Sequence, residues 1–397
     1  MSLRKLYLQH VGQTSEMPLL LEVDHAKGIY ITDRNGKVYM DLNSGISVSS
    51  TGHAHPKIIA AITSQTEKHL HTMVYGEHVL SSQVALAQKI TQQTDSLDTI
   101  YYLLTGTEVV EAAMKLAKKR TNRVEVIAAE NAYHGSTQGS ESLRSDENYK
   151  QAFYPLLPGI SWIKFNDFSS LDKITAKTAA VIIEPVQAEA GVILPQNNFL
   201  LEAQKRCREN GALFILDEIQ TGFGRTGKMF AFQKMGLQPD LVCLGKAMGG
   251  GLPLSALLGS KEIIAELAKN PALGHISTFG GHPLSCAAGN ASLEIIMQEN
   301  LMDQIEAKEA LFHKKLKHPI IKEVRSAGLM MAVEVTKRKY LKHVVTKALE
   351  LGVIVDYFLF NSTSFRLAPP LIISTEEIER ACSILVEAME FALAQYT

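Results

Sequence analysis

Short apolar runs alternate with helix-like stretches in the middle of the chain, between residues 100 and 260. Each run is apolar throughout, whereas a strand with one face in water alternates apolar and polar residues. Unbroken runs are therefore typical of strands buried on both faces of a parallel sheet. The runs span residues 100–104, 124–128, 179–183, 213–216, 241–244 and 254–259. Because helical patterns such as residues 108–119 and 199–210 lie between them, the sequence predicts an α/β fold with helices on a mostly parallel sheet.

The two ends of the chain have a different pattern. Residues 28–32 and 37–42 flank the turn signal Asn35-Gly36 and predict a small antiparallel hairpin, followed by helices at 58–70 and 81–91. Beyond Pro283, one long helical stretch (284–317) precedes strand-like runs at 329–335 and 353–357 and a closing helix from Thr375. We expect a large α/β domain over residues 48–285 and a smaller α+β domain built from 1–47 and 286–397, with the hairpin packed against the C-terminal part.

Composition narrows the class of protein. With 46% hydrophobic and 20% charged residues, the 397-residue chain can bury a large core. Its 40 basic and 41 acidic residues nearly cancel, which gives no support to a nucleic-acid or membrane-surface partner. The four cysteines show neither disulfide nor zinc spacing, and no apolar run reaches the roughly 20 residues that a membrane span needs. We therefore expect a soluble protein of the reducing cytoplasm.

Three of the buried runs end on a charged residue: Glu184, Asp217 and Lys246. Successive positions are 33 and 29 residues apart, each about one strand–helix–strand unit. Asp217 and Lys246 are therefore expected at the same carboxyl edge of the sheet, where such folds bind ligands. A buried lysine has a lowered pKa and a nucleophilic neutral amine. The alternatives are a plain Asp217–Lys246 ion pair and a solvated lysine in the glycine-rich loop that follows.

Two other segments that follow strands point to the same edge. Thr105-Gly106-Thr107-Glu108 opens a predicted helix, and its hydroxyls and free amides suit an anion such as phosphate. The same residues match a capping box, Thr105 with Glu108, and the two interpretations are compatible. Tyr133 follows another strand and is either a plate for a flat cofactor or a core aromatic.

The remaining motifs are weaker. Residues 222–228 formally match both a dinucleotide-binding fingerprint and a phosphate loop. As a dinucleotide fingerprint the segment is misplaced, because residues 217–221 separate the strand from the first glycine. As a phosphate loop it lacks the metal-binding hydroxyl, because Met229 stands at that position. A nicotinamide-dependent dehydrogenase built on this segment is the alternative from another class of function. The pairs at His53/His55 and His69/His71 lack acidic or cysteine neighbours, so we expect no metal site.

A lysine nucleophile, a carboxylate one crossover away, an anion site and an aromatic plate together suit a pocket for pyridoxal 5′-phosphate (PLP). Eight ordered segments make the chain resemble the class III (ω-amino-acid) aminotransferases, and most closely the acetylornithine/ornithine aminotransferase group. They are Gly52-His53-Ala54-His55-Pro56, Thr105-Gly106-Thr107-Glu108, Tyr133-His134-Gly135, Ile183-Glu184-Pro185-Val186-Gln187, Leu216-Asp217-Glu218-Ile219-Gln220-Thr221-Gly222, Leu244-Gly245-Lys246-Ala247, Ser277-Thr278-Phe279-Gly280-Gly281 and Phe365-Arg366-Leu367-Ala368-Pro369-Pro370. The resemblance implies PLP-dependent transferase fold type I: a large domain with a mostly parallel seven-stranded sheet and a smaller α+β domain.

The resemblance also implies a role for each cofactor-site residue. Lys246 would bind PLP covalently and move the proton during catalysis, and Asp217 would keep the pyridine nitrogen protonated. Thr278 would reach the phosphate of the neighbouring subunit, which implies a homodimer with shared sites. The other implied cofactor contacts are ring stacking by Tyr133 with His134 beside it, the phenolic oxygen at Gln220, and the phosphate at Thr105, Gly106 and Thr107.

Three positions bear on the substrate. Arg366 matches the arginine that grips the carboxylate of glutamate or 2-oxoglutarate, and Glu189 matches the carboxylate that neutralises this arginine when an ω-amino substrate enters. Ser136 departs from the acetylornithine and ornithine enzymes, which usually have an arginine there for a second carboxylate. We expect ping-pong transfer of a terminal amino group from an ornithine- or N-acetylornithine-like donor to 2-oxoglutarate. The alternative within the class uses pyruvate as acceptor.

Overall fold

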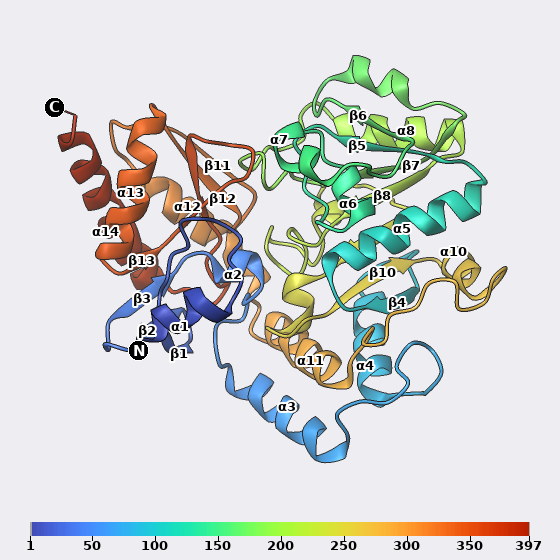
Figure 1. Cartoon of the computed structure of the whole chain (residues 1–397), viewed down its shortest axis with the longest axis horizontal. Coiled ribbons are helices and arrows are strands. Elements are labelled where there is room, and N and C mark those ends of the chain that lie inside the picture. Colours follow the sequence, from blue (N-terminus) through green and yellow to red (C-terminus); the bar gives the residue numbers. More distant parts are fainter. Residues whose placement is uncertain (1, 397) are drawn as a thin grey trace.

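The computed structural model describes residues 2–396 and contains three sheets (Figure 1). The largest has seven strands in the order β4-β10-β9-β8-β7-β5-β6. β10 runs antiparallel to both of its neighbours, whereas the pairs from β9 through β8, β7 and β5 to β6 are all parallel. The expected α/β fold with a mostly parallel seven-stranded sheet is therefore confirmed.

The six apolar runs all form strands of this sheet. They could be predicted from the sequence because the strands are largely buried. β7, β9 and β10 are buried at every residue. The pattern does not predict β6, which is an edge strand with a single buried residue and so lacks an apolar run. The seven strands are β4 Thr99–Leu103, β5 Glu125–Ala129, β6 Ile160–Ile163, β7 Thr178–Ile183, β8 Leu213–Asp217, β9 Leu241–Leu244 and β10 Ser255–Gly259.

Helices flank this sheet on both sides, and two of them have clear terminal signals. α5 (Gly106–Thr121) begins after the extended Thr105 and ends at Asn122, which takes the left-handed conformation at φ 55°. α8 (Phe199–Asn210) ends at Gly211, also left-handed. The other helices between Pro56 and Gln298 are α3 Pro56–Lys68, α4 Ser81–Thr91, α6 Gln138–Ser142, α7 Glu147–Lys150, α9 Ala231–Lys234, α10 Lys261–Ile264 and α11 Pro283–Gln298. No helix within residues 2–396 combines the length and the apolar composition that crossing a membrane requires.

Both ends of the chain meet in a second sheet, with the order β1-β2-β3-β13. The predicted hairpin forms from β2 (Tyr30–Asp33) and β3 (Val38–Asp41), preceded by the short helix α1 (Leu3–His10) and β1 (Val23–Lys27). β3 pairs in parallel with β13 (Val353–Ile354), so the expected packing of the hairpin against the C-terminal part is confirmed. In Figure 1 the blue N-terminal strands lie beside the red and orange C-terminal elements.

The C-terminal elements differ from the prediction in detail. The stretch 284–317 is not one helix: α11 ends at Gln298 and α12 spans Ile305–Lys315, because Asn300 between them has a left-handed φ of 50°. The run 353–357 is divided between two sheets, with β14 (Asp356–Tyr357) in a third sheet of order β11-β12-β15-β14. The other elements are α2 Ser44–Ser47, β11 Ile321–Ser326, β12 Met331–Val335, α13 Arg338–Glu350, β15 Ser364–Leu367 and α14 Thr375–Ala394. The domain limits at 47/48 and 285/286 stay a prediction, since the second falls inside α11.

The glycine-rich segment 222–228 links the large sheet to the C-terminal part. It is a series of turns and opens no helix within the described residues, as a dinucleotide or phosphate motif would require. Arg225 is fully buried and donates hydrogen bonds to the carbonyl oxygens of Leu329 and Pro369 and to Ser50 Oγ. The segment therefore has a structural role that explains its composition without a nucleotide.

Candidate active site

A cavity of about 290 Å³ lies at the carboxyl edge of the large sheet, where β5, β7, β8 and β9 end. Of the predicted cofactor-site residues, all but Thr105 and Thr278 line it, and Ser136 does as well. The lining residues are Gly106, Thr107, Tyr133, His134, Gly135, Ser136, Glu184, Asp217, Ile219, Gln220, Thr221 and Lys246. The expectation that Asp217 and Lys246 share one edge of the sheet is confirmed, and Glu184 lies there as well.

Lys246 is separated from the end of β9 by Gly245 alone and begins a 3-10 helix, Lys246–Gly249. Its φ of 50° is left-handed, a conformation that is uncommon outside glycine and asparagine and that clusters at functional sites. Burial lowers the pKa of Lys246 to about 8, although the Glu189 carboxylate opposes part of this shift. The amine is therefore far easier to deprotonate than that of a surface lysine.

This lowered pKa gives a testable pH dependence. In the cofactor-free protein, amine acylation at Lys246 is expected to reach half its maximal rate near pH 8, because only the neutral amine reacts and its fraction rises with pH through the pKa. Pulse labelling at several pH values, followed by peptide mass spectrometry, measures this midpoint. The exposed Lys228 in the same digest serves as the internal comparison. A midpoint for Lys246 near the ordinary lysine value of about 10.4 would contradict the assignment.

Asp217 ends β8 and is paired with a histidine instead of the lysine. Its Oδ2 lies 2.7 Å from His134 Nδ1, and its Oδ1 accepts a hydrogen bond from the Ile219 amide at 3.0 Å. Burial alone would lower the pKa of His134, but the Asp217 carboxylate, with a smaller contribution from Glu184, more than reverses this effect, so the pKa is raised. An Asp217–Lys246 ion pair is absent among residues 2–396, which rules out the simple structural interpretation of these two charges.

The start of α5 forms the wall next to Lys246. Thr105 Oγ1 accepts a hydrogen bond from the Glu108 amide at 3.4 Å, and Glu108 Oε2 accepts from the Leu104 amide at 2.9 Å. The helix is thus capped, with the glutamate bonded one residue earlier than in a standard capping box. Gly106 and Thr107 still face the cavity, and a helix start of this kind attracts anions.

Gly135 closes this wall tightly. A Cβ atom added there would lie 2.5 Å from Thr107 Oγ1, and the φ of 134° is one that side chains rarely adopt. Thr107 Oγ1 is also 2.7 Å from Ser140 Oγ and 2.8 Å from Thr137 Oγ1. The result is a cradle of small and hydroxylated residues around the helix start, which fits a phosphate group.

Tyr133 lines the cavity and is only partly buried, so it is not a core aromatic. Its hydroxyl lies 3.3 Å from Ser136 Oγ, and the guanidinium carbon of the buried Arg144 lies 4.9 Å from its ring centroid. A cation at this distance from a ring is attracted to its face. The ring is therefore held in place by Arg144 while it borders the cavity.

Glu189 and Arg366 form a buried ion pair close to Lys246. Arg366 Nη2 is 2.6 Å from Glu189 Oε1, and the two residues are 2% and 5% exposed respectively. Neither residue is among those that line the cavity, but both charges act on the pKa of Lys246. Within residues 2–396, Nε and Nη1 of Arg366 are buried and have no hydrogen-bond partner. Such donors are costly to leave unpaired, and they suit a carboxylate.

Glu184 also lines the cavity, although no role was predicted for it. It accepts hydrogen bonds from the Ala188 amide at 3.0 Å and from the Tyr133 amide at 3.4 Å. Burial raises its pKa to about 7. The signal was its position as the charged end of a buried run, the same signal that singled out Asp217 and Lys246.

The cavity offers a group for each part of PLP. The amine of lowered pKa suits the aldehyde, and the buried carboxylate suits the pyridine nitrogen. The start of the helix suits the phosphate, and the aromatic side chain suits the ring. With this fold, they define a PLP-dependent enzyme of fold type I. The chain belongs to the class III aminotransferases, whose family model, described as Aminotransferase class-III, matches residues 11–389. It is therefore a PLP-dependent transaminase.

Individual relatives agree with this family. The chain is 37% identical over 380 residues to an acetylornithine aminotransferase of Methanothermobacter thermautotrophicus, with 94% of each chain covered. It is 39% identical over 387 residues to an ornithine aminotransferase of Bacillus subtilis, again with 94% of each covered. Among solved structures, an ornithine aminotransferase from Toxoplasma gondii with PLP at partial occupancy is similar at a TM-score of 0.91 and 31% identity, covering 98% of this chain and 94% of that one.

Proposed function

We propose that this transaminase moves the terminal amino group of an ornithine- or N-acetylornithine-like donor to 2-oxoglutarate in two alternating half-reactions. The observation that carries the proposal is the buried Glu189–Arg366 pair, whose charges act on the pKa of Lys246. The names of the similar acetylornithine and ornithine aminotransferases support the donor class. A single pocket that must accept two chemically different partners in turn needs a charge that is paired for one and released for the other.

Arg366 provides that charge. A 2-oxo acid places a carboxylate next to the reacting carbon. Once Glu189 releases Nη2, such a group can bind Arg366 through Nη2 together with either Nε or Nη1, both of which are unpaired. A terminal amino group arrives without a carboxylate beside it, and Glu189 then keeps the arginine neutralised. The pair therefore supports a two-stage exchange, which is the ping-pong sequence.

The proposed roles at the cofactor follow the cavity walls. PLP, when bound, supplies the electron sink that stabilises negative charge on the substrate carbon. Asp217, oriented by His134, would stabilise the protonated pyridine nitrogen. Lys246 would hold the cofactor covalently, and its amine would carry the proton during the transfer. The other proposed contacts are Tyr133 on the ring face, Gln220 at the phenolic oxygen, and Thr105, Gly106 and Thr107 at the phosphate.

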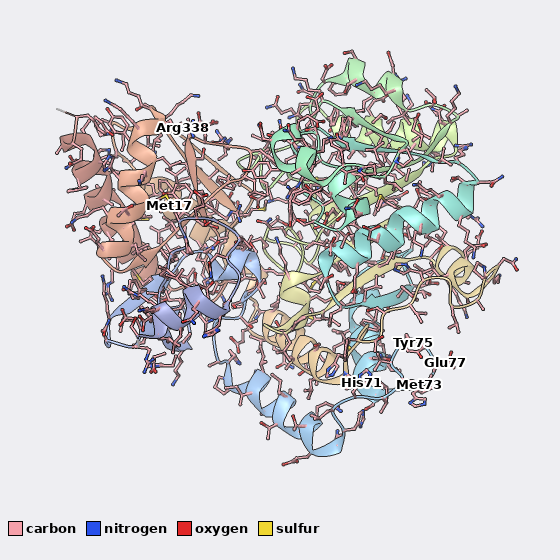
Figure 2. The ribbon with its side chains drawn as sticks, viewed as in Figure 1. Met17, His71, Met73, Tyr75, Glu77 and Arg338 are labelled. Atoms are coloured by element: carbon pink, nitrogen blue, oxygen red, sulfur yellow. The ribbon has the colours of Figure 1, made fainter. Side chains whose placement is uncertain are left out.

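We further propose a homodimer in which Thr278 completes the partner's phosphate site. Thr278 is exposed and lies outside the cavity of its own chain. Next to it, Phe279 packs against His71, with ring centroids 5.1 Å apart. Figure 2 shows His71, Met73, Tyr75 and Glu77 on the loop between α3 and α4, at the rim of the molecule. Leu70, Met73, Val79, Ile276 and Phe279 are exposed there, an apolar surface that suits a subunit interface.

The proposed compartment is the cytoplasm. All four cysteines are free thiols and buried, and none is part of a disulfide. Chains that keep their cysteines reduced are typical of reducing compartments.

Pyruvate is the second candidate acceptor, and Ser136 is the observation that favours it. Ser136 lines the cavity and offers only a hydroxyl, already close to Tyr133. Pyruvate has one carboxylate, which Arg366 can bind, whereas 2-oxoglutarate has a second one that a serine binds weakly.

A screen of half-reactions tests the proposal. Purified enzyme in the PLP form is mixed with ornithine, N-acetylornithine or 4-aminobutyrate, and the change in cofactor absorbance is followed. The amine form is then mixed with 2-oxoglutarate or pyruvate. Rapid conversion by ornithine or N-acetylornithine and return by 2-oxoglutarate are expected. Return by pyruvate alone would replace the acceptor, and lack of conversion by either ornithine compound would overturn the donor class.

The substitution Ser136→Arg is expected to increase kcat/KM for 2-oxoglutarate about 10- to 150-fold, because a charge-assisted hydrogen bond contributes about 1.5 to 3 kcal/mol. The value for pyruvate should change little, since its single carboxylate is bound elsewhere. Ser136→Gln, which is polar and long but uncharged, is the matched control. Equal kcat/KM for 2-oxoglutarate in the wild type and Ser136→Arg would mean that another side chain already binds the second carboxylate.

A further inference from the structure

Residues 358–361, here called the clamp segment, hold the Glu189 member of the buried pair. The Leu359 amide donates a hydrogen bond to Glu189 Oε2 at 3.2 Å, while Glu189 Oε1 contacts Arg366. The Phe360 amide donates to the Glu189 backbone carbonyl at 3.0 Å. The side-chain orientation that pairs Glu189 with Arg366 therefore depends on where the clamp segment presents the Leu359 amide.

The same segment also contacts the other member of the pair. The guanidinium carbon of Arg366 lies 4.7 Å from the ring centroid of the buried Phe358. At its far end, Asn361 Nδ2 donates to the Ala190 carbonyl at 3.3 Å, and a Cβ atom at Gly191 would lie 2.5 Å from that nitrogen. The clamp segment thus fits closely around both partners, so a shift of the segment changes the geometry of the pair.

Tyr149, on the short helix α7, reaches the clamp segment from another part of the fold. Its hydroxyl donates a hydrogen bond to the Leu359 carbonyl at 3.2 Å. Its ring meets that of Phe360 edge to face, at 5.7 Å and 86°. Figure 1 shows α7 on the side of the large sheet that faces β11 and β12. Tyr149 therefore fixes the clamp segment relative to the sheet that carries Lys246 and Asp217.

Arg144 holds Tyr149 in turn. Its guanidinium carbon is 5.3 Å from the Tyr149 ring centroid and 4.9 Å from that of Tyr133, the ring that borders the cavity. Arg144 is 6% exposed and is anchored by Glu141 at 3.0 Å. Tyr149 is thus attached to the cavity wall itself, and the position of the clamp segment is set from that wall.

We propose that Tyr149 is a positioning residue for substrate exchange. By holding the clamp segment, it favours the Glu189–Arg366 pair and so determines how readily Arg366 is released to a carboxylate substrate. The inference rests on the proposed roles of Arg366 and Glu189. When a carboxylate takes Arg366, Glu189 must give up its bond to the Leu359 amide, and the free energy of that step depends on how firmly the amide is held.

Tyr149→Phe tests the proposal because it removes only the hydroxyl that binds Leu359. In the PLP-loaded enzyme, glutarate, an unreactive dicarboxylate, is titrated by calorimetry. We expect glutarate to bind about two- to twelvefold more tightly to Tyr149→Phe, the factor that one hydrogen bond contributes. The half-reaction with ornithine or N-acetylornithine should slow by a similar factor, since the neutralised state of Arg366 is less populated. A general loss of structure would instead weaken glutarate binding and also slow the half-reaction.

Tyr154→Phe is the matched control. Tyr154 lies five residues further along, and its hydroxyl donates to Glu147 at 3.0 Å and not to the clamp segment. It should bind glutarate as the wild type does. If Tyr149→Phe and Tyr154→Phe bind glutarate equally, Tyr149 has no positioning role. Arg366→Lys tests the proposed function separately from the role of Tyr149. Unchanged glutarate affinity in that variant would refute the carboxylate site at Arg366, and with it the proposed function, whatever Tyr149 does.

Discussion

Replacing Lys246 by alanine is expected to lower the transamination rate by about 10⁴-fold, the upper end of what a positioned acid–base contributes, because the nucleophile is lost as well. The protein should remain folded. The amine is partly desolvated, and removing it takes away an unfavourable burial of charge. Steady-state turnover and thermal unfolding measure the two effects.

Lys228→Ala is the control for this substitution, since Lys228 is exposed and lies in the glycine-rich segment outside the cavity. It should retain wild-type turnover. Borohydride treatment gives a second readout: it should attach the cofactor irreversibly to the peptide that contains Lys246 in the wild type and in Lys228→Ala. Near-normal turnover of Lys246→Ala, or attachment at another lysine, would refute the assignment.

Asp217→Asn is expected to reduce turnover by about 10²- to 10³-fold, the usual effect of removing one preorganised charge from a buried site. The amide keeps the shape of the side chain but loses the negative charge that we propose for the pyridine nitrogen. The pKa of His134 should fall at the same time, because the carboxylate that raises it is gone while the burial that lowers it remains. NMR titration of the His134 ring checks this second effect without any turnover.

Asp240→Asn provides the comparison for Asp217→Asn. Asp240 stands at the opposite end of β9 and accepts a hydrogen bond from the Phe214 amide at 2.8 Å, so its loss affects the sheet but not the cavity. It should alter stability and leave the His134 titration unchanged. If Asp217→Asn kept most of its turnover while the His134 pKa fell, the carboxylate would orient the histidine only.

The central sheet could be predicted from the sequence because its strands are buried on both faces, and the same burial made Glu184, Asp217 and Lys246 conspicuous at their ends. The contacts that these residues make could not be predicted from the sequence. Asp217 is 83 residues from His134, and no local pattern relates a histidine in one loop to a carboxylate at the end of another strand. Only that contact excluded the alternative of an Asp217–Lys246 ion pair.

The strand that carries Arg366 could not be predicted from the hydrophobic pattern, for a different reason. β15 has four residues, Ser-Phe-Arg-Leu, all buried, with a serine and an arginine inside the run. Periodicity needs a longer window, so only the family resemblance identified the arginine. α13 is the opposite case: Tyr340, Leu341, Val344 and Ala348 form a buried stripe at helical spacing, a readable signal that the prediction overlooked.

The sheet that joins the two ends of the chain has a consequence for synthesis. β3 (Val38–Asp41) leaves the ribosome early, but its parallel partner β13 (Val353–Ile354) is made 312 residues later. Translation proceeds at about 5 to 20 residues per second, so one edge of the nascent hairpin stays unpaired for about 15 to 60 s until β13 has been synthesised. During that interval its unpaired amides and carbonyls are open to other chains, so translation speed and chaperone occupancy bear on the yield of this enzyme.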